Sequence, residues 1–390
     1  MRKTPKKLNK KRCLVALLVL IIAIVIIILL FGKNDKNEIL TVLLNNEIIE
    51  LSDVPIIDEE QNIYFSKDDI QNIFDENIYY NEAEKELITT YNTHIALLKV
   101  DEKYALINNE NIEIKGKLQE VKREIYVPIK DIQEVYDIEV SYSSKTNRII
   151  IDSTLNKKIE SSVIKRTNLK SRKGLFASKV ESLIVGDKVT ILEEDGSYKK
   201  VKTINGNIGY IKTKKLSSEN IVREDTVYTN EKIKVYTNYS NISGVYENFT
   251  VDESFVNCVI PTFFYVEKDS KVLDKTSSTT ATYAVYKNWA DTNKLTILPT
   301  LSNDAEVSNC LLTYSQRSQV INELITYLKE HQYFGINVNF SSIDDINSFY
   351  RFIIELSPRI KKENLKLVVT SNKNIDKGKI EKIVDYIIEE

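Results

Sequence analysis

Three consecutive segments determine the architecture of the C-terminal half of the chain: LTILPTL at 295–301, a helical period at 315–331, and GINVNF at 335–340. The two apolar runs predict strands, and the segment between them repeats its apolar positions at helical spacing. Strands that alternate with helices are typical of βα units in a parallel sheet. We therefore expect an α/β domain in this half of the chain.

The alternation extends over residues 233–390, which predict a partial (β/α) barrel of the TIM type. Further strands and helices are expected in chain order: the strand GVYENF at 244–249, a strand at 256–264, a helix at 279–291, a helix at 344–356 ending at the Ser-Pro pair, a strand at 365–370, and a last helix from about 377 to 388. The segment is shorter than the roughly 250 residues of a complete barrel. We therefore expect an open sheet whose edge is covered by a partner hydrolase or by a second copy in a homodimer, or else a truncated remnant.

Residues in these strands resemble glycoside hydrolase family 18, in the branch of spore and cell-wall N-acetylglucosaminidases. The resemblance lies in VIPTFF at 259–264, LPTLSN at 298–303, Arg317 and FGINVNFS at 334–341. In that family the fourth strand carries D-x-x-D-x-D-x-E. The glutamate protonates the leaving oxygen, and the last aspartate holds the substrate acetamido group, whose carbonyl attacks the anomeric carbon.

Aligned with that motif, the chain has no carboxylate at any of the four positions, which are Phe334, Asn337, Asn339 and Ser341. A serine hydroxyl is too weak an acid to replace the glutamate. Asp344 and Asp345 follow the strand, where acids cap the next helix. The resemblance therefore implies a pseudoenzyme that binds glycan, with no catalytic residue, metal or cofactor. The aromatic candidates for sugar binding are Tyr246, Phe263, Phe264, Trp289 and Phe340.

The N-terminal half contains an internal repeat with a period of 62 residues. IYFSKDDIQNIFD at 63–75 matches IYVPIKDIQEVYD at 125–137, and alternating stretches follow each copy. The pattern predicts a strand, a short helix and a hairpin, twice. Residues 38–153 resemble the copper amine oxidase N-terminal-like domain of bacterial envelope proteins, a module without copper chemistry, and we expect an α+β stalk.

Dense turn residues indicate a small all-β barrel at 163–217. Asn205-Gly206 predicts a type I′ hairpin turn. The segments NLKSR at 168–172, GDKVTILE at 186–193, YKKVKT at 198–203 and GNIGYI at 206–211 resemble the bacterial SH3 domain. That resemblance implies contact with peptidoglycan, with Tyr198 and Tyr210 as binding candidates, although an inert spacer remains an alternative.

The N-terminus predicts a membrane anchor. Residues 1–12 contain seven basic and no acidic residues, and an uncharged apolar run fills 13–31. A helix of about 20 residues crosses a bilayer, and the positive-inside rule places the basic tail in the cytosol. We expect a single-pass anchor at 13–32 with the bulk of the chain extracytoplasmic; a cleaved signal peptide is the alternative.

The amino-acid composition excludes several classes of partner and site. The 390 residues include 54 basic and 56 acidic side chains, a balance that argues against nucleic acid as a partner. Two histidines exclude a three-imidazole metal site, and three cysteines without CxxC spacing form no disulfide framework. Three functions stay open: a membrane-anchored protein that binds cell-wall glycan or peptidoglycan, an active N-acetylglucosaminidase, and a structural stalk or inactive remnant.

Overall fold

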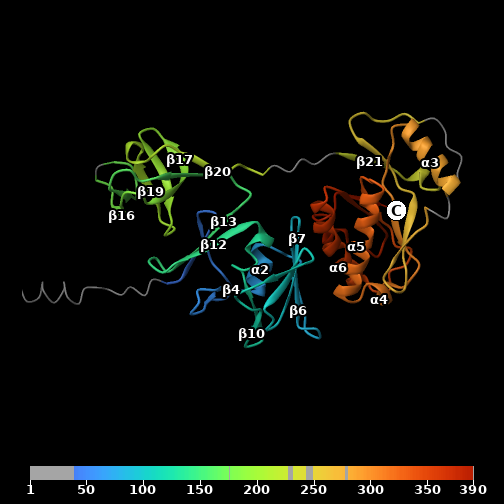
Figure 1. Ribbon diagram of the computed structural model, residues 1–390, viewed down its shortest axis with the longest axis horizontal. Helices are drawn as coiled ribbons and strands as arrows, with labels where there is room; N and C mark the ends of the chain where they lie inside the picture. The colour runs from blue at the N-terminus through green and yellow to red at the C-terminus, as the bar shows by residue number, and fades with distance from the viewer. Residues whose placement is uncertain (1–38, 175, 227–231, 243–248, 277–279, 390) are drawn as a thin grey trace, which may run out of the picture.

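The computed structural model describes residues 39–174, 176–226, 232–242, 249–276 and 280–389. The basic tail and the apolar segment expected at 13–32 lie outside these residues. Among the residues that the structure describes, no helix has the length and apolar character to span a membrane. Figure 1 shows a central repeat domain, a β-barrel on one side of it and an α/β domain on the other.

The repeat domain, residues 39–153, consists of three sheets and two short helices. The first sheet has the order β12 (Ile138–Ser143), β13 (Arg148–Ser153), β1 (Thr41–Leu44) and β2 (Glu47–Ile49), and the second has β10 (Gln119–Val121), β11 (Glu124–Pro128), β4 (Ile63–Ser66) and β3 (Ile56–Ile57). The third is a meander of β5 (Tyr79–Asn81), β6 (Glu86–Tyr91), β7 (His94–Lys99), β8 (Tyr104–Ile107) and β9 (Glu110–Glu113). The helices are α2 (Lys67–Ile73) and the 3-10 helix η1 (Gln133–Tyr136).

The two copies of the sequence repeat lie side by side in the second sheet. Strand β4 pairs antiparallel with β11, so that Phe65 faces Val127. Ile70 and Ile132, which occupy equivalent repeat positions, are both fully buried in one core. The predicted succession of strand, short helix and hairpin is therefore present twice, although the second helix is a single 3-10 turn.

Residues 158–223 form an antiparallel barrel around a small apolar core that includes Leu169, Val189 and Val201. Its seven strands have the order β16 (Lys179–Leu183), β15 (Thr167–Lys170), β19 (Ile208–Lys212), β18 (Tyr198–Thr203), β17 (Lys188–Asp195), β14 (Lys158–Ser162) and β20 (Asn220–Arg223). Strands β14 and β20 extend it beyond the expected 163–217. A 3-10 helix, η2 (Thr213–Lys215), follows β19.

The Asn205-Gly206 hairpin is present, but its turn differs from the predicted type I′. Gly206 has a φ of 74°, whereas Asn205 is not among the residues with positive φ. The Gly206 N–H donates to the Thr203 carbonyl at 2.9 Å, so the turn is centred on Ile204 and Asn205 and only the following glycine is left-handed, as in three-residue hairpin loops. The turn also contacts the repeat domain: the Ser143 hydroxyl donates to Asn205 Oδ1 at 3.0 Å, and Arg148 Nη1 donates to the Gly206 carbonyl at 2.7 Å. The turn therefore serves as a docking point between the two domains.

The α/β domain contains six neighbouring parallel strand positions. They are, in chain order, β21 (Ile233–Tyr236), the interrupted strand β22 (Val256–Val259) and β23 (Thr262–Val266), the interrupted strand β25 (Thr296–Ile297) and β26 (Thr300–Asn303), β27 (Gly335–Val338), β28 (Lys366–Ser371) and β29 (Tyr386–Glu389). Pro261 and Pro299 lie at the two interruptions, because proline cannot donate to the ladder. Strand β24 (Val272–Asp274) pairs antiparallel with β23 at the edge.

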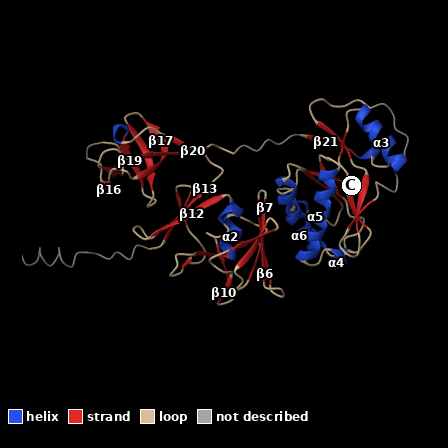
Figure 2. Ribbon diagram, in the orientation of Figure 1, coloured by secondary structure: helices blue, strands red, loops and turns tan. Residues whose placement is uncertain are grey.

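Helices cover one face of this sheet and link its strands. They are α3 (Thr280–Thr292), α4 (Val307–Cys310), α5 (Tyr314–Glu330) and α6 (Ile346–Lys362), with the 3-10 turns η3 (Thr237–Tyr239) and η5 (Lys377–Lys379). Figure 2 shows α5 and α6 between the sheet and the repeat domain. The succession of strands and helices agrees with the predicted partial barrel.

Two predictions about this domain differ from the structure, and a third concerns residues that lie mostly outside the described ones. Helix α6 continues through Pro358 to Lys362 instead of ending at Leu356, because proline removes only one helical hydrogen bond. The predicted last helix is wrong: Asp376 caps a single 3-10 turn, and residues 386–389 form β29 against β28. The expected strand at 244–249 falls almost entirely outside the described residues, and β21 occupies the edge position instead.

The meander of the repeat domain packs on α5 and α6. Ile88, Ile95 and Leu97 form an apolar cluster with Tyr314 of α5, and β6 and β7 contact α6. Figure 1 shows β7 next to α6. The helical layer is thus enclosed by the parallel sheet on one side and by the repeat domain on the other.

Candidate functional site

Strand β27 and the residues directly before and after it carry the positions that align with the family motif. Ile336, Val338 and Phe340 belong to the core under the helices. Because side chains alternate along a strand, Asn337 and Asn339 lie on the opposite face, which we call the inner face. The motif positions Asn337 and Asn339 therefore share one face of the sheet, as the alignment requires.

The side chain of Asn337 is fully buried and its hydrogen bonds are used within the sheet. Its Nδ2 donates to Thr300 Oγ1 at 3.0 Å, and Thr370 Oγ1 donates to its Oδ1 at 3.0 Å. The Thr300 hydroxyl in turn donates to the Ile260 carbonyl at 3.0 Å. Asn337 thus links three neighbouring strands and is not available to a substrate.

The remaining motif positions have different surroundings. Phe334 packs against a small apolar cluster on the inner face that contains Leu298 and Val368. Asn339 is half-buried, and its backbone N–H donates to the Leu301 carbonyl at 2.9 Å. Ser341 is exposed, and its backbone N–H donates to Asn303 Oδ1 at 2.9 Å. Ser341 is therefore the exposed motif residue, whereas Phe334 and Asn339 are half-buried.

Carboxylates close to this strand end are engaged as caps. Asp345 accepts hydrogen bonds from the backbone N–H groups of Asn347 and Ser348 at the start of α6, as expected, and Asp344 bonds both the N–H and the hydroxyl of Ser308. The Ser348 hydroxyl lowers the pKa of Asp345, and the Ser308 hydroxyl lowers the pKa of Asp344. A general acid needs a raised pKa, so neither group is suited to that role at neutral pH.

The structure places the predicted aromatic platform in the core. Phe263, Phe264 and Phe340 are at most 3% exposed and pack under the helices. The indole of Trp289 on α3 stacks at a tilt on Tyr239, with ring centroids 5.2 Å apart. The three phenylalanine rings therefore form no exposed stacking surface for sugar, Trp289 is half-buried, and Tyr246 lies outside the described residues.

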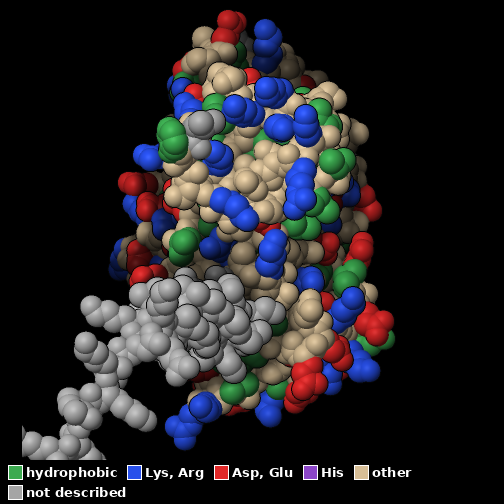
Figure 3. All heavy atoms as spheres, turned by 90° about the vertical axis from the view of Figure 1, so that its left-hand side faces the viewer, with side chains coloured by type: hydrophobic (Ala, Val, Ile, Leu, Met, Phe, Trp, Pro, Cys, Tyr) green, Lys and Arg blue, Asp and Glu red, His purple; other side chains and the backbone are tan. Residues whose placement is uncertain are grey.

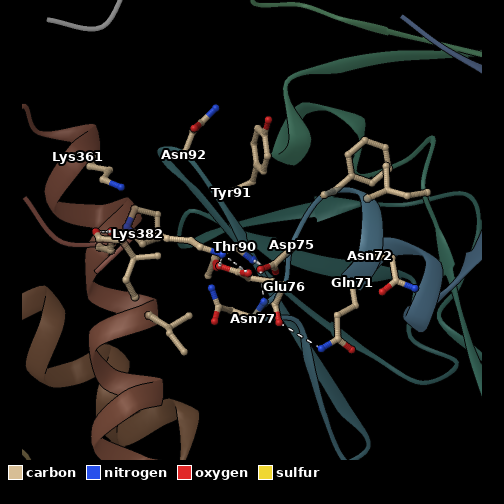
Figure 4. Close-up of a pocket in the computed structure, with 16 residues that line it drawn as sticks. Gln71, Asn72, Asp75, Glu76, Asn77, Thr90, Tyr91, Asn92, Lys361 and Lys382 are labelled. Carbon is tan, nitrogen blue, oxygen red and sulfur yellow. Dashed lines mark hydrogen bonds and ion pairs between the residues drawn. The ribbon is translucent and has the colours of Figure 1, made fainter. Parts of the chain in front are cut away.

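A cleft that sequence reasoning did not find lies between the repeat domain and the end of α6. Figure 4 shows this cleft, with Asp75, Glu76 and Asn77 on one wall and Lys361 and Lys382 on the other. Its volume is about 370 Å³. No sequence signal marks it, because its walls come from two domains whose docking is not encoded in any local pattern.

Three charged groups in this cleft have shifted pKa values: Asp75, Lys361 and Lys382, whose hydrogen bond to Glu76 raises its pKa. Burial raises the pKa of Asp75, although its carboxylate accepts hydrogen bonds from the Thr89 hydroxyl at 2.7 Å and the Thr90 N–H at 2.7 Å. Burial lowers the pKa of Lys361. Lys382 forms an ion pair with Glu76 at 2.8 Å. Perturbed groups of this kind gather at functional sites.

The part of the chain that the structure describes contains no cluster of metal-binding side chains. No group of three or more histidine, cysteine, aspartate or glutamate side chains is placed there to hold an ion. Cys258 and Cys310 are buried and unpaired, and burial raises the pKa of the Cys258 thiol to about 12. A thiol with such a pKa is a poor nucleophile at neutral pH.

Comparison with protein families finds a match within the repeat domain. Residues 43–151 match the copper amine oxidase N-terminal domain, in agreement with the resemblance seen in the sequence. A comparison with curated protein sequences finds no match. The family match covers this domain of the chain and does not extend to the barrel or the α/β domain.

Solved structures similar to the chain include several chitinases. A chitinase from Bacteroides thetaiotaomicron is 17% identical, with a TM-score of 0.30 over 35% of this chain and 45% of its own. A chitinase from Chromobacterium violaceum ATCC 12472 is 20% identical, with a TM-score of 0.30 over 35% and 48%. The Ostrinia furnacalis Group IV chitinase is 15% identical, with a TM-score of 0.31 over 41% and 51%. The chain spans about half the length of these solved chains.

Proposed function

We propose that this protein binds a cell-wall glycan without hydrolysing it. The observation that carries the proposal is the chemistry at the end of β27, where the glycosidase-like motif has amides and a hydroxyl in place of its carboxylates. Asn337 is used inside the sheet, and the two nearest aspartates are caps with lowered pKa values. Asn339 and Ser341 bring an amide and a hydroxyl to this strand end, of which the hydroxyl donates to the Asn303 carbonyl at 3.2 Å, and neither side chain is a proton donor for catalysis.

The barrel supports a second contact with the cell wall. Tyr198 and Lys200 of β18 pair with Lys212 and Tyr210 of β19, so the four side chains lie on one face of the sheet. Lys212 Nζ lies 5.9 Å from the centroid of the Tyr198 ring. Figure 3 shows that lysine and arginine side chains gather at this end of the molecule. Tyrosine rings and ammonium groups suit the sugars and carboxylates of peptidoglycan, as the resemblance to bacterial SH3 domains implies.

The proposed location is the outer side of the cell membrane. The apolar segment at 13–32 acts as a single-pass anchor with residues 1–12 in the cytosol, and the described domains extend from it towards the wall. Addition of protease to intact, wall-stripped cells tests this arrangement. Removal of the domains is expected, and protection of residues beyond 33 would contradict the proposed orientation.

Sedimentation with insoluble peptidoglycan tests the binding proposal. The full chain in detergent is expected to enter the pellet, and a Tyr198→Ala/Tyr210→Ala double variant is expected to stay largely in the supernatant. Tyr104→Ala is the matched control, because that tyrosine is 54% exposed on the repeat domain. A wild-type chain that remains in the supernatant would refute the proposal, and a double variant that pellets like the control would exclude the barrel face.

A further inference from the structure

The walls of the cleft between the repeat domain and α6 come from segments that are far apart in the sequence. One wall is the segment after α2, from Phe74 to Asn77, together with Tyr91 and Asn92 at the β6–β7 turn, and the other wall is the last turns of α6 with Lys361. The volume of about 370 Å³ falls within the range of roughly 300–1,000 Å³ that holds small ligands.

Most charges around the cleft are already compensated. Asp75 accepts three hydrogen bonds, the third from the Asn77 backbone N–H at 2.9 Å. Glu76 is paired with Lys382. Asp385, whose charge acts on Lys361 from a distance, is paired with Lys366. Among the residues that the structure describes, these interactions leave one charge in the cleft without a direct partner.

That charge is the ammonium group of Lys361. Among the described residues it has no hydrogen bond or ion pair, and Figure 4 shows the side chain extending from the end of α6 towards the repeat domain. Burial lowers its pKa, because the charged form has lost part of its hydration. An anionic group in the cleft would restore the lost stabilisation.

A second polar group on the cleft wall, the Asn77 side chain, has unused hydrogen-bonding capacity among the described residues. The side-chain amide of Asn77 has no partner among the described residues, although its backbone N–H bonds Asp75. An amide side chain carries both a donor, Nδ2, and an acceptor, Oδ1. Together with Lys361, Asn77 therefore offers an ammonium, an amide donor and an amide acceptor, a set that matches an anion carrying a neighbouring hydroxyl group.

We propose that this interdomain cleft binds a small hydroxylated anion, with Lys361 as the charged contact and Asn77 as a second donor. The anionic group is a carboxylate or a phosphate on a sugar or polyol. The proposal does not rest on the inner face of the sheet or on the barrel. Because both walls are needed, ligand binding would also hold the repeat domain and α6 together.

Titration calorimetry of the full chain in detergent tests the proposal with three probes. N-acetylmuramic acid carries a carboxylate, glycerol 3-phosphate carries a phosphate, and N-acetylglucosamine is neutral. At least one anionic probe is expected to bind, and the neutral sugar is expected to bind at least about tenfold more weakly. If only one anionic probe binds, its carboxylate or phosphate is the anionic group that the cleft recognises. Absence of binding by both anionic probes would overturn the proposal.

Two variants show whether binding occurs in this cleft. Lys361→Gln is expected to lower the affinity for the anionic probe by about tenfold or more. Lys362→Gln, at the exposed neighbouring position, is expected to bind the probe like wild type. As a second measurement, the bound probe should slow acylation of Lys361, followed by mass spectrometry. Equal affinity of wild type and Lys361→Gln, or acylation unaffected by the probe, would overturn the proposal.

Discussion

Arg317 of α5 and Glu355 of α6 form a buried ion pair with two hydrogen bonds. Arg317 Nε lies 2.9 Å from Glu355 Oε2, and Nη2 lies 2.8 Å from Oε1, with side chains at most 1% exposed. Tyr79 of the repeat domain completes the group, because its hydroxyl donates to Glu355 at 2.9 Å and accepts from Arg317 at 2.6 Å. Burial raises the pKa of Glu355, and the guanidinium opposes that shift.

Removal of the Tyr79 hydroxyl should loosen the contact between the repeat domain and α6. Tyr79→Phe leaves two buried charged groups without one partner, so we expect a loss of about 1–3 kcal/mol in the free energy of unfolding. Trp289, the single tryptophan of the chain, reports unfolding of the α/β domain by fluorescence in urea. Tyr80→Phe is the matched control, because its half-buried phenol has no hydrogen bond to a described residue. Equal midpoints for the two variants would contradict this role for Tyr79.

The Asn205-Gly206 turn should be sensitive to an added methyl group. A Cβ on Gly206 would lie 2.9 Å from Arg148 Cδ and 3.0 Å from Ile150 Cγ1, whereas a Cβ on Gly196 meets nothing within 4 Å. Both glycines have positive φ, so each alanine costs about 1 kcal/mol in backbone strain. Gly206→Ala is expected to lower the melting temperature more than Gly196→Ala and to expose residues 154–157 to protease. The same melting temperature for both would show that the turn does not dock.

A carboxylate should not be tolerated at the buried motif position. In Asn337→Asp, the new oxygen faces Thr300 Oγ1, whose hydrogen is already donated to the Ile260 carbonyl. We expect a loss of about 3 kcal/mol at pH 7, because burial raises the pKa of the new carboxyl. The variant should regain stability as the pH falls and the carboxyl becomes neutral. Asn339→Asp, at the half-buried position on the same face, is the control, and equal losses would contradict the structural role of Asn337.

The cap of α6 should give a characteristic pH dependence. Asp345→Ala is expected to cost about 1 kcal/mol at pH 7 through the loss of its hydrogen bonds to the helix start. Because the hydrogen bond from Ser348 lowers the pKa of Asp345 in the folded protein, its contribution is complete above the unfolded value of about 3.9 and is lost as the pH falls through the folded value. The difference between wild type and variant in urea unfolding should therefore shrink below about pH 4. A difference that stays constant well below pH 4 would indicate that the charge of Asp345 does not stabilise α6.

Local patterns predicted most of the individual elements. The apolar runs that contain Ile336 and Val368 form strands β27 and β28, and the helical period from 315 to 331 corresponds to α5. The 62-residue repeat predicted two equivalent units. The structure agrees, since each unit places an isoleucine, Ile70 or Ile132, in the same core. The short run at 384–388 was assigned to a helix, yet it pairs with β28, because the neighbouring strand edge outweighs local propensity in so short a segment.

The functional surface was less predictable, because it depends on which face a residue takes and which domain lies next to it. The motif alignment found Asn337, Asn339 and Ser341, but only the fold shows that Asn337 is used within the sheet. The rings of Phe263 and Phe340 were expected to stack on sugars, and their place under the helices follows from alternation against a helical layer. Arg317 was noted for a family resemblance, whereas its buried contact with Tyr79 joins residues 238 positions apart.

The central claim is binding without hydrolysis, and one assay tests it most directly. The full chain is incubated with peptidoglycan and with an aryl N-acetylglucosamine oligomer, and bound protein, reducing ends and released phenol are measured together. We predict that the wild type binds peptidoglycan and releases neither product above background, because it lacks both the general acid and the aspartate that orients the acetamido group, and the acid alone is worth about 10²–10⁴ in rate. The Ser341→Glu/Asn339→Asp double variant serves as a comparison, and activity confined to it would show that the inner face still admits substrate. Product released by the wild-type chain above background would contradict the account.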